Sequence, residues 1–107
     1  MVTRSHARSI NAFGAIADPT RRAILDVLRA GERTAGDLAD QFPVSRPAVS
    51  RHLRILRRAG LISERRDMRS RLYSLDGRAL AHVDEWLQPY RLFWTARRLG
   101  VATSLSR

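Results

Sequence analysis

Residues 46–58 contain five arginines. Arginines repeated in this way along one segment are suited to binding anions. If this stretch is an α-helix with 100° per residue, the arginines share one side and Val49, Leu53 and Leu56 form an apolar seam on the other. Each guanidinium offers a planar fork of N–H donors that matches a phosphate or the edge of a guanine. Such a helix can rest on a protein core and present its cationic side to DNA. The five are Arg46, Arg51, Arg54, Arg57 and Arg58.

The N-terminal end of a DNA-reading helix normally enters the major groove. We therefore expect base contacts from Arg46, Pro47, Ser50 and Arg51, and phosphate contacts from Arg54, Arg57 and Arg58. An arginine fork on a guanine gives about 1–3 kcal/mol of discrimination, whereas Ser50 specifies little and Pro47 offers only apolar contact. The alternative is a charged face that serves solubility, although such faces usually mix both signs and this one has no acid.

A second cationic cluster surrounds a predicted hairpin, with strands at 61–66 and 71–75. Residues 45–71 contain nine arginines and two acids, Glu64 and Asp67, so their net charge is +7. A cationic loop of this kind suits a flanking phosphate or the minor groove, and the alternative is a surface hairpin kept soluble by charge. The hairpin arginines are Arg65, Arg66, Arg69 and Arg71.

Capping residues and apolar spacing predict the helices that position these side chains. We expect helices ending near Ala17, from Pro19 to about Gly31, from Thr34 to before Pro43, from Ser45 to Gly60, and from about Gly77 to Leu99. Pro89 should kink or split the last one. The predicted fold is mainly α with a small two-stranded β-hairpin, in one domain spanning residues 1–107.

Composition narrows the class of protein. The formal net charge of +10 and the sequence pI near 11.7 indicate an anionic partner, first of all nucleic acid. Every basic residue is arginine, which genome base composition alone can cause. Without cysteine, the chain can form no disulfide, thiolate metal site or cysteine nucleophile. No apolar run approaches the roughly 18 residues of a membrane span, and the N-terminus lacks a signal-peptide core, so we expect a cytoplasmic protein.

Three segments together resemble the ArsR (arsenic-repressor) family of winged helix-turn-helix regulators. They are ADPTRRAILDVL at 17–28, VSRPAVSRHLRILRRAGLI at 44–62 and RLYSLD at 71–76, within a match that covers about residues 8–99. The resemblance implies a homodimeric bacterial or archaeal repressor that binds double-stranded DNA, with base contacts at the positions of Arg46, Pro47, Ser50 and Arg51. Polar residues are more usual in the family at the positions of Pro47 and Arg51, so the operator sequence is left open.

Many relatives sense metals through a cysteine pair or through His and carboxylate ligands on the last helix. This chain would be a cysteine-free subtype, and only His82, Asp84 and Glu85 are available for the second kind of site. His82 and Glu85 share a helix face, but the partner cluster further along that helix is missing. We therefore predict no metal and no cofactor, and expect His52 to pack against the preceding helix rather than bind a metal.

An aromatic stripe on the last helix predicts how two copies join. Four of the seven aromatic residues lie within nine positions, which leaves a small domain with more apolar surface than it easily covers. Pairing of these stripes would place two DNA-reading helices about one DNA turn apart. The alternative is packing on the first helix within one chain. The predicted interface is Ile10, Phe13, Trp86, Leu87, Tyr90, Phe93 and Trp94.

These patterns leave two binding functions open and disfavour catalysis. The chain is either a sequence-specific homodimeric repressor at a palindromic operator or a basic protein that coats DNA or RNA without sequence choice. A metal-responsive repressor is a variant of the first. No G-x-S-x-G, phosphate-binding glycine loop or H-E-x-x-H occurs, and the neighbouring Asp84 and Glu85 diverge on a helix. We therefore expect no enzyme.

Overall fold

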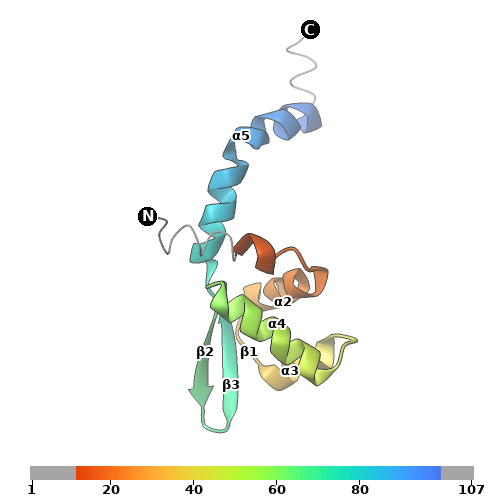
Figure 1. The fold of residues 1–107 in the computed structure, drawn as a ribbon, viewed down its shortest axis with the longest axis vertical. Coiled ribbons are helices and arrows are strands. Elements are labelled where there is room, and N and C mark those ends of the chain that lie inside the picture. The colour runs from red at the N-terminus through yellow and green to blue at the C-terminus, as the bar shows by residue number, and fades with distance from the viewer. Residues whose placement is uncertain (1–11, 100–107) are drawn as a thin grey trace.

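The computed structural model describes residues 12–99 and confirms the predicted class of fold, with a helical body, a hairpin and a long last helix (Figure 1). Residues 12–15 are helical and precede the first labelled element. The elements are α2 (Pro19–Arg29), β1 (Arg33–Thr34), α3 (Ala35–Gln41), α4 (Arg46–Arg58), β2 (Ile62–Asp67), β3 (Ser70–Leu75), the 3-10 turn η1 (Gly77–Ala79) and α5 (Leu80–Leu99).

Each of the helices α2, α3 and α4 begins at a side-chain cap that the sequence indicated. A cap oxygen accepts a backbone N–H that has no partner within the helix, which fixes where the helix starts. Asp76 caps η1 in the same way, through the N–H of Arg78 at 3.1 Å. The other cap bonds run from Arg21 N–H to Asp18 (3.0 Å), from Asp37 N–H to Thr34 (3.0 Å) and from Ala48 N–H to Ser45 (3.2 Å).

The C-terminal end of α4 is closed by a glycine turn that leads directly into β2. The N–H of Gly60 donates to the carbonyl of Arg57, and the N–H of Leu61 donates to the carbonyl of Leu56, both at 3.0 Å. This pair of bonds is the Schellman arrangement, and it requires a positive φ at the residue after the cap. Gly60 supplies it with φ +79°. Only Ala59–Leu61 separate α4 from the hairpin.

The core lies between the three helices and the sheet. The apolar seam predicted for α4 is buried, with Val49, Leu53 and Leu56 at 3% exposure or less. Leu38 of α3 and Tyr73 of β3 are buried in the same cluster. α5 rises away from this body (Figure 1), so α4 is held from one side only and its arginine side is left open.

The sheet has one strand more than the predicted hairpin. Its order is β1-β3-β2, all antiparallel, with Arg33 opposite Tyr73 and Thr34 opposite Leu72. β1 is only two residues long, which is too short to show the alternation that marks a strand. The hairpin turn is also tighter than predicted, since β3 begins at Ser70 and pairs it with Asp67.

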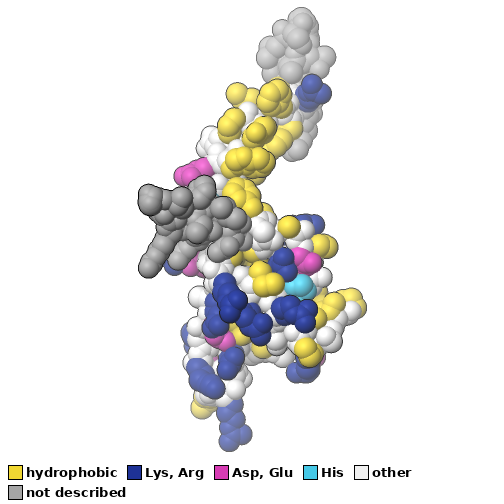
Figure 2. Space-filling view, viewed as in Figure 1, with side chains coloured by type: hydrophobic (Ala, Val, Ile, Leu, Met, Phe, Trp, Pro, Cys, Tyr) yellow, Lys and Arg dark blue, Asp and Glu magenta, His cyan; other side chains and the backbone are white. Residues whose placement is uncertain are grey.

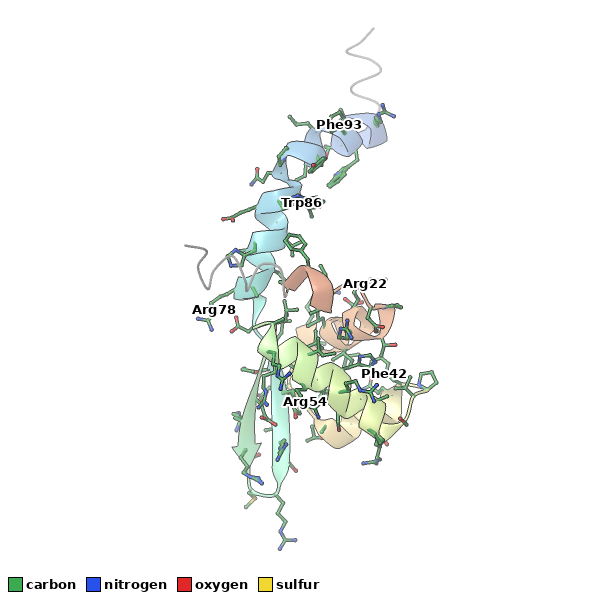
Figure 3. The ribbon with its side chains drawn as sticks, in the orientation of Figure 1. Arg22, Phe42, Arg54, Arg78, Trp86 and Phe93 are labelled. Atoms are coloured by element: carbon green, nitrogen blue, oxygen red, sulfur yellow. The ribbon has the colours of Figure 1, made fainter. Side chains whose placement is uncertain are left out.

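α5 bends but remains one helix. Pro89 lies inside it, and the helix axis changes direction between Trp86 and Phe93 (Figure 3). Proline has no N–H to donate and its ring displaces the carbonyl one turn earlier, so the predicted kink is confirmed. None of the helices in residues 12–99 combines the length and apolar composition that a bilayer-spanning segment requires.

Candidate nucleic-acid interface

The four side chains predicted to contact bases are all exposed. Arg46, Pro47, Ser50 and Arg51 occupy the first two turns of α4 on the side away from the core. Only Arg46 has an ion-pair partner within the described chain, Asp40 at 3.5 Å, and both side chains are 73% exposed. Ion pairs so open to water contribute little and separate easily. This end of the helix is therefore free to meet another molecule.

Several of the predicted phosphate-binding arginines are also free. In residues 12–99 their side chains make no hydrogen bond or ion pair, and all are exposed. Figure 2 shows the basic side chains gathered over α4 and along the hairpin, with few acids among them. The free side chains on α4, besides Arg51, are Arg54 and Arg58, and those on the hairpin are Arg66 and Arg69.

α4 and the hairpin enclose an open cationic groove. One hollow of about 280 Å³ lies between Ser50, Arg54 and Arg57 on the helix side and Arg71 and Tyr73 on the strand side. A second, of about 410 Å³, continues along the hairpin past Arg65 and Arg66. Guanidiniums on two walls of one groove can hold a phosphate between them. Arg54 is labelled in Figure 3 on α4, on the groove side.

Glu64 lies in this groove, although sequence reasoning gave it no place there. Its side chain is 17% exposed and lines both hollows of the groove. It forms ion pairs with Arg57 of α4 and, at 3.5 Å, with Arg71 of β3, and it accepts a hydrogen bond from the Tyr73 hydroxyl at 2.8 Å. Burial, and then the bond to Glu64, raise the pKa of Tyr73, so the phenol stays protonated as the donor. Arg57 and Arg71, both predicted to bind DNA, are thus already paired with Glu64 within the chain.

Arg65 is also paired. Its guanidinium binds Glu32 with both Nε (3.2 Å) and Nη2 (3.0 Å), a two-pronged contact between the hairpin and the segment that precedes β1. No sequence pattern indicated this pair, because the two residues are 33 positions apart and meet only when the sheet forms. Arg66 and Arg69 of the hairpin are therefore more available to an anionic partner than Arg65 and Arg71.

The aromatic stripe of α5 is partly packed and largely exposed. Phe13 meets Trp86 edge to face at 5.7 Å, and Trp86 meets Tyr90 at 5.1 Å. Even so, Trp86 is 55% and Phe93 65% exposed, and Leu87 is half-buried. Packing on the first helix thus covers part of the stripe, and the rest remains an exposed apolar surface. Tyr90 and Trp94 are exposed too, and Ile10 lies outside the described residues.

The acidic and histidine side chains of α5 do not assemble into a ligand set. Within residues 12–99 no three histidines or carboxylates come close enough to share a metal ion. Asp84 instead forms an ion pair with Arg91, seven residues further along α5. His82 lines a separate hollow with Arg58 and Arg78. The chemistry that the described surface supports is therefore anion binding at α4 and the hairpin.

Comparison with known proteins agrees with this geometry. Residues 16–65 match the family described as helix-turn-helix domain. The chain is 47% identical over 77 residues to the transcriptional repressor SdpR of Bacillus subtilis, covering 72% of this chain and 86% of that protein. It is 44% identical over 91 residues to the regulator Rv2034 of Mycobacterium tuberculosis, covering 85% and 82%. A crystal structure of an ArsR family transcriptional regulator superposes with a TM-score of 0.74 at 29% identity, covering 89% and 97%. The chain therefore belongs to the ArsR family of winged helix-turn-helix transcriptional regulators.

Proposed function

We propose that this protein is a sequence-specific transcriptional repressor that binds a palindromic operator as a homodimer. The observation that supports it most is the exposed, acid-free arginine side of α4, whose opposite side is anchored in the core. Arg46, Pro47, Ser50 and Arg51 contact bases, and Arg54 and Arg58 contact the flanking phosphates. The hairpin extends the contact with Arg66 and Arg69. The repressor role follows the name of the relative SdpR, and the site of action is the cytoplasm.

The dimer rests on the exposed part of the α5 stripe. Apolar side chains as open as Trp86 and Phe93 lose contact with water when a second copy covers them, which favours association. A two-fold pairing brings two α4 helices to one side of the duplex, with half-sites about 34–36 Å apart. The operator then has the same two-fold symmetry as the protein.

Selection of bound sites from random duplexes tests the sequence preference. The expected result is a palindromic consensus, bound about 10³–10⁷ times more tightly than unrelated DNA at the same salt concentration. Selection with and without added zinc should return the same consensus, because the described residues hold no ligand set. A pool without consensus, competed equally by unrelated DNA and RNA, would instead identify a nonspecific basic protein.

Light scattering tests the dimer separately. One chain has a mass of 12.2 kDa, so the expected mass is twice that, 24.4 kDa. A mass of one chain at the concentrations that saturate the operator would exclude the proposed symmetry, even if sequence preference were found.

A further inference from the structure

Glu64 places a negative charge at the floor of the groove that should bind the DNA backbone. It projects from β2 between α4 and β3, and its two carboxylate oxygens divide their partners. Oε1 holds Arg57 from the helix, while Oε2 accepts from Tyr73 at 2.8 Å and faces Arg71 at 3.5 Å. One carboxylate thus engages two guanidiniums that would otherwise line the groove as free cations.

The carboxylate of Glu64 is anchored and cannot follow its arginines to another partner. Glu64 and Tyr73 lie opposite each other in the β2–β3 register, and Tyr73 is buried at 7% exposure. The partly dehydrated surroundings strengthen the two ion pairs, in contrast to the open Arg46–Asp40 pair. A phosphate that enters the groove must therefore compete with a fixed carboxylate for both Arg57 and Arg71.

This competition acts unequally on the two kinds of DNA complex. Nonspecific affinity comes almost entirely from phosphate contacts, and it grows with the number of cations that reach them. On unrelated DNA the protein can settle wherever most arginines meet phosphates. At an operator the base contacts of Arg46 and Arg51 fix the register, so extra cations deeper in the groove add less. Withdrawing cations therefore weakens nonspecific binding more than specific binding.

We propose that Glu64 is a specificity-determining residue, which holds Arg57 and Arg71 back from the DNA backbone and so widens the preference for the operator over other sequences. The inference rests on the proposed function, because such a preference exists only in a protein that reads sequence. It assigns backbone binding to the unpaired Arg54 and Arg58.

The test is the salt dependence of DNA binding by Glu64→Gln, which keeps the shape of the side chain and an acceptor for Tyr73 but removes the charge. On unrelated DNA, the slope of log K against log salt should steepen by about one to two, since each added phosphate contact contributes about 0.9. Nonspecific affinity near 0.1 M salt should rise roughly tenfold per added contact. The ratio of operator to nonspecific affinity should fall.

Asp40→Asn is the matched control, because it changes the net charge equally but releases only Arg46 from an exposed pair. Its slope should stay within about half a unit of the wild-type slope. A second variant, with Arg57 and Arg71 also replaced by Gln, should lose the steepening caused by Glu64→Gln. Thermal melting of each variant, monitored by circular dichroism, confirms that the binding protein is folded.

The outcomes distinguish a failure of this inference from a failure of the proposed repressor function. If wild-type protein shows no operator preference, the proposed function fails. If the preference exists but Glu64→Gln leaves the slope on unrelated DNA unchanged, Glu64 has a structural role only and the inference is overturned. A steeper slope with an undiminished preference for the operator overturns it as well.

Discussion

The guanidinium of Arg21 on α2 contacts the imidazole of His52 on α4, with Nη1 3.2 Å from Nδ1. Because an arginine always donates, Nδ1 is the acceptor here and the ring proton of a neutral His52 lies on Nε2. The same guanidinium donates to the carbonyls of Ala15 (2.7 Å) and Gly14 (3.2 Å). Arg21 therefore links α4 to the end of the first helix. His52 was expected to pack against the preceding helix, α3, but its hydrogen-bond partner lies on α2.

Arg21→Ala should destabilise the fold, because it leaves the part-buried carbonyl of Ala15, the exposed carbonyl of Gly14 and the imidazole of His52 without their donor. The expected loss is about 2 kcal/mol in the free energy of unfolding, which lowers Tm by roughly 10 °C in a chain of this size. Thermal and urea unfolding measure it. Arg29→Ala is the control on the same helix, with the same charge change at an exposed side chain, and should cost less than about 1 kcal/mol. Equal losses in the two variants would show that the Arg21 contacts contribute nothing of their own.

Arg51→Ala should reduce operator binding far more than binding to unrelated DNA. Loss of a base contact is expected to cost about 1–3 kcal/mol, roughly a tenfold to hundredfold change in Kd, on the operator only. Arg58→Ala, at the other end of α4, should weaken both complexes alike and flatten the salt slope by about 0.9. Titrations on both duplexes at several salt concentrations distinguish them. Indistinguishable profiles would mean that α4 does not read bases.

Arg57→Ala should flatten the salt slope less than Arg58→Ala does. The two residues are neighbours at the end of the same helix, and both are exposed, but only Arg57 is paired with Glu64. A guanidinium that is already neutralised releases fewer counterions when DNA binds. The measurement is the same salt titration on unrelated DNA. A full loss of about 0.9 from Arg57→Ala would show that the ion pair opens on binding.

Replacing Phe93 and Trp94 together by Ala should convert the dimer to a monomer. In the proposed dimer their exposed rings supply apolar area that the second copy covers, and its loss weakens association. Light scattering should report 12.2 kDa, and operator binding should weaken because the two half-sites are no longer bound together. Met68→Ala removes an apolar side chain that is 91% exposed at the tip of the hairpin, and should leave the mass unchanged. A doubly substituted protein that stays dimeric would assign the interface elsewhere.

Asp18 should make the stability of the protein fall in acid. The N–H of Arg21 bonds to the carboxylate and is the main cause that holds the pKa of Asp18 below its ordinary value. The folded state therefore favours the ionised form, so this contribution is complete above the ordinary aspartate range and is lost as pH falls through the lowered pKa. Urea unfolding from pH 6 down to pH 3 should show wild type losing its advantage over Asp18→Asn below about pH 4. A difference that does not change with pH would refute the charge effect.

The local features of the fold could be predicted from the sequence because short-range bonds determine them. Asp18, Thr34 and Ser45 each cap a helix through a residue three positions ahead, which a sequence shows directly. The glycine at 60 and the proline at 89 act on their own helices in the same way. The buried seam of α4 followed from its periodicity.

The pairings across the sheet could not be predicted in this way. β1 forms because Arg33 and Thr34 pair with β3, about forty residues further along the chain. A two-residue strand is too short to show an alternation of apolar and polar residues. Counting arginines gave the correct cationic surface but treated every guanidinium as equally available. Glu64 and Glu32 form ion pairs with some of these arginines and not with others. Which arginines are paired depends on the side chains that the β2–β3 register brings together.

The short Ala59–Leu61 connection, with its two backbone hydrogen bonds, ties α4 to the base of the hairpin. An inserted residue there would rotate the hairpin relative to the helix, and in the proposed complex would misalign both with the grooves of the duplex. The opposite end, at Met68 and Arg69, lacks these bonds, because both side chains are open to water and neither makes a hydrogen bond or ion pair within the described residues. Two residues added to each strand at that end would extend the hairpin by about 7 Å and keep the turn residues on their original faces, whereas one would turn them over. In the proposed complex the reach of the hairpin along the duplex can therefore be changed at the tip without disturbing α4.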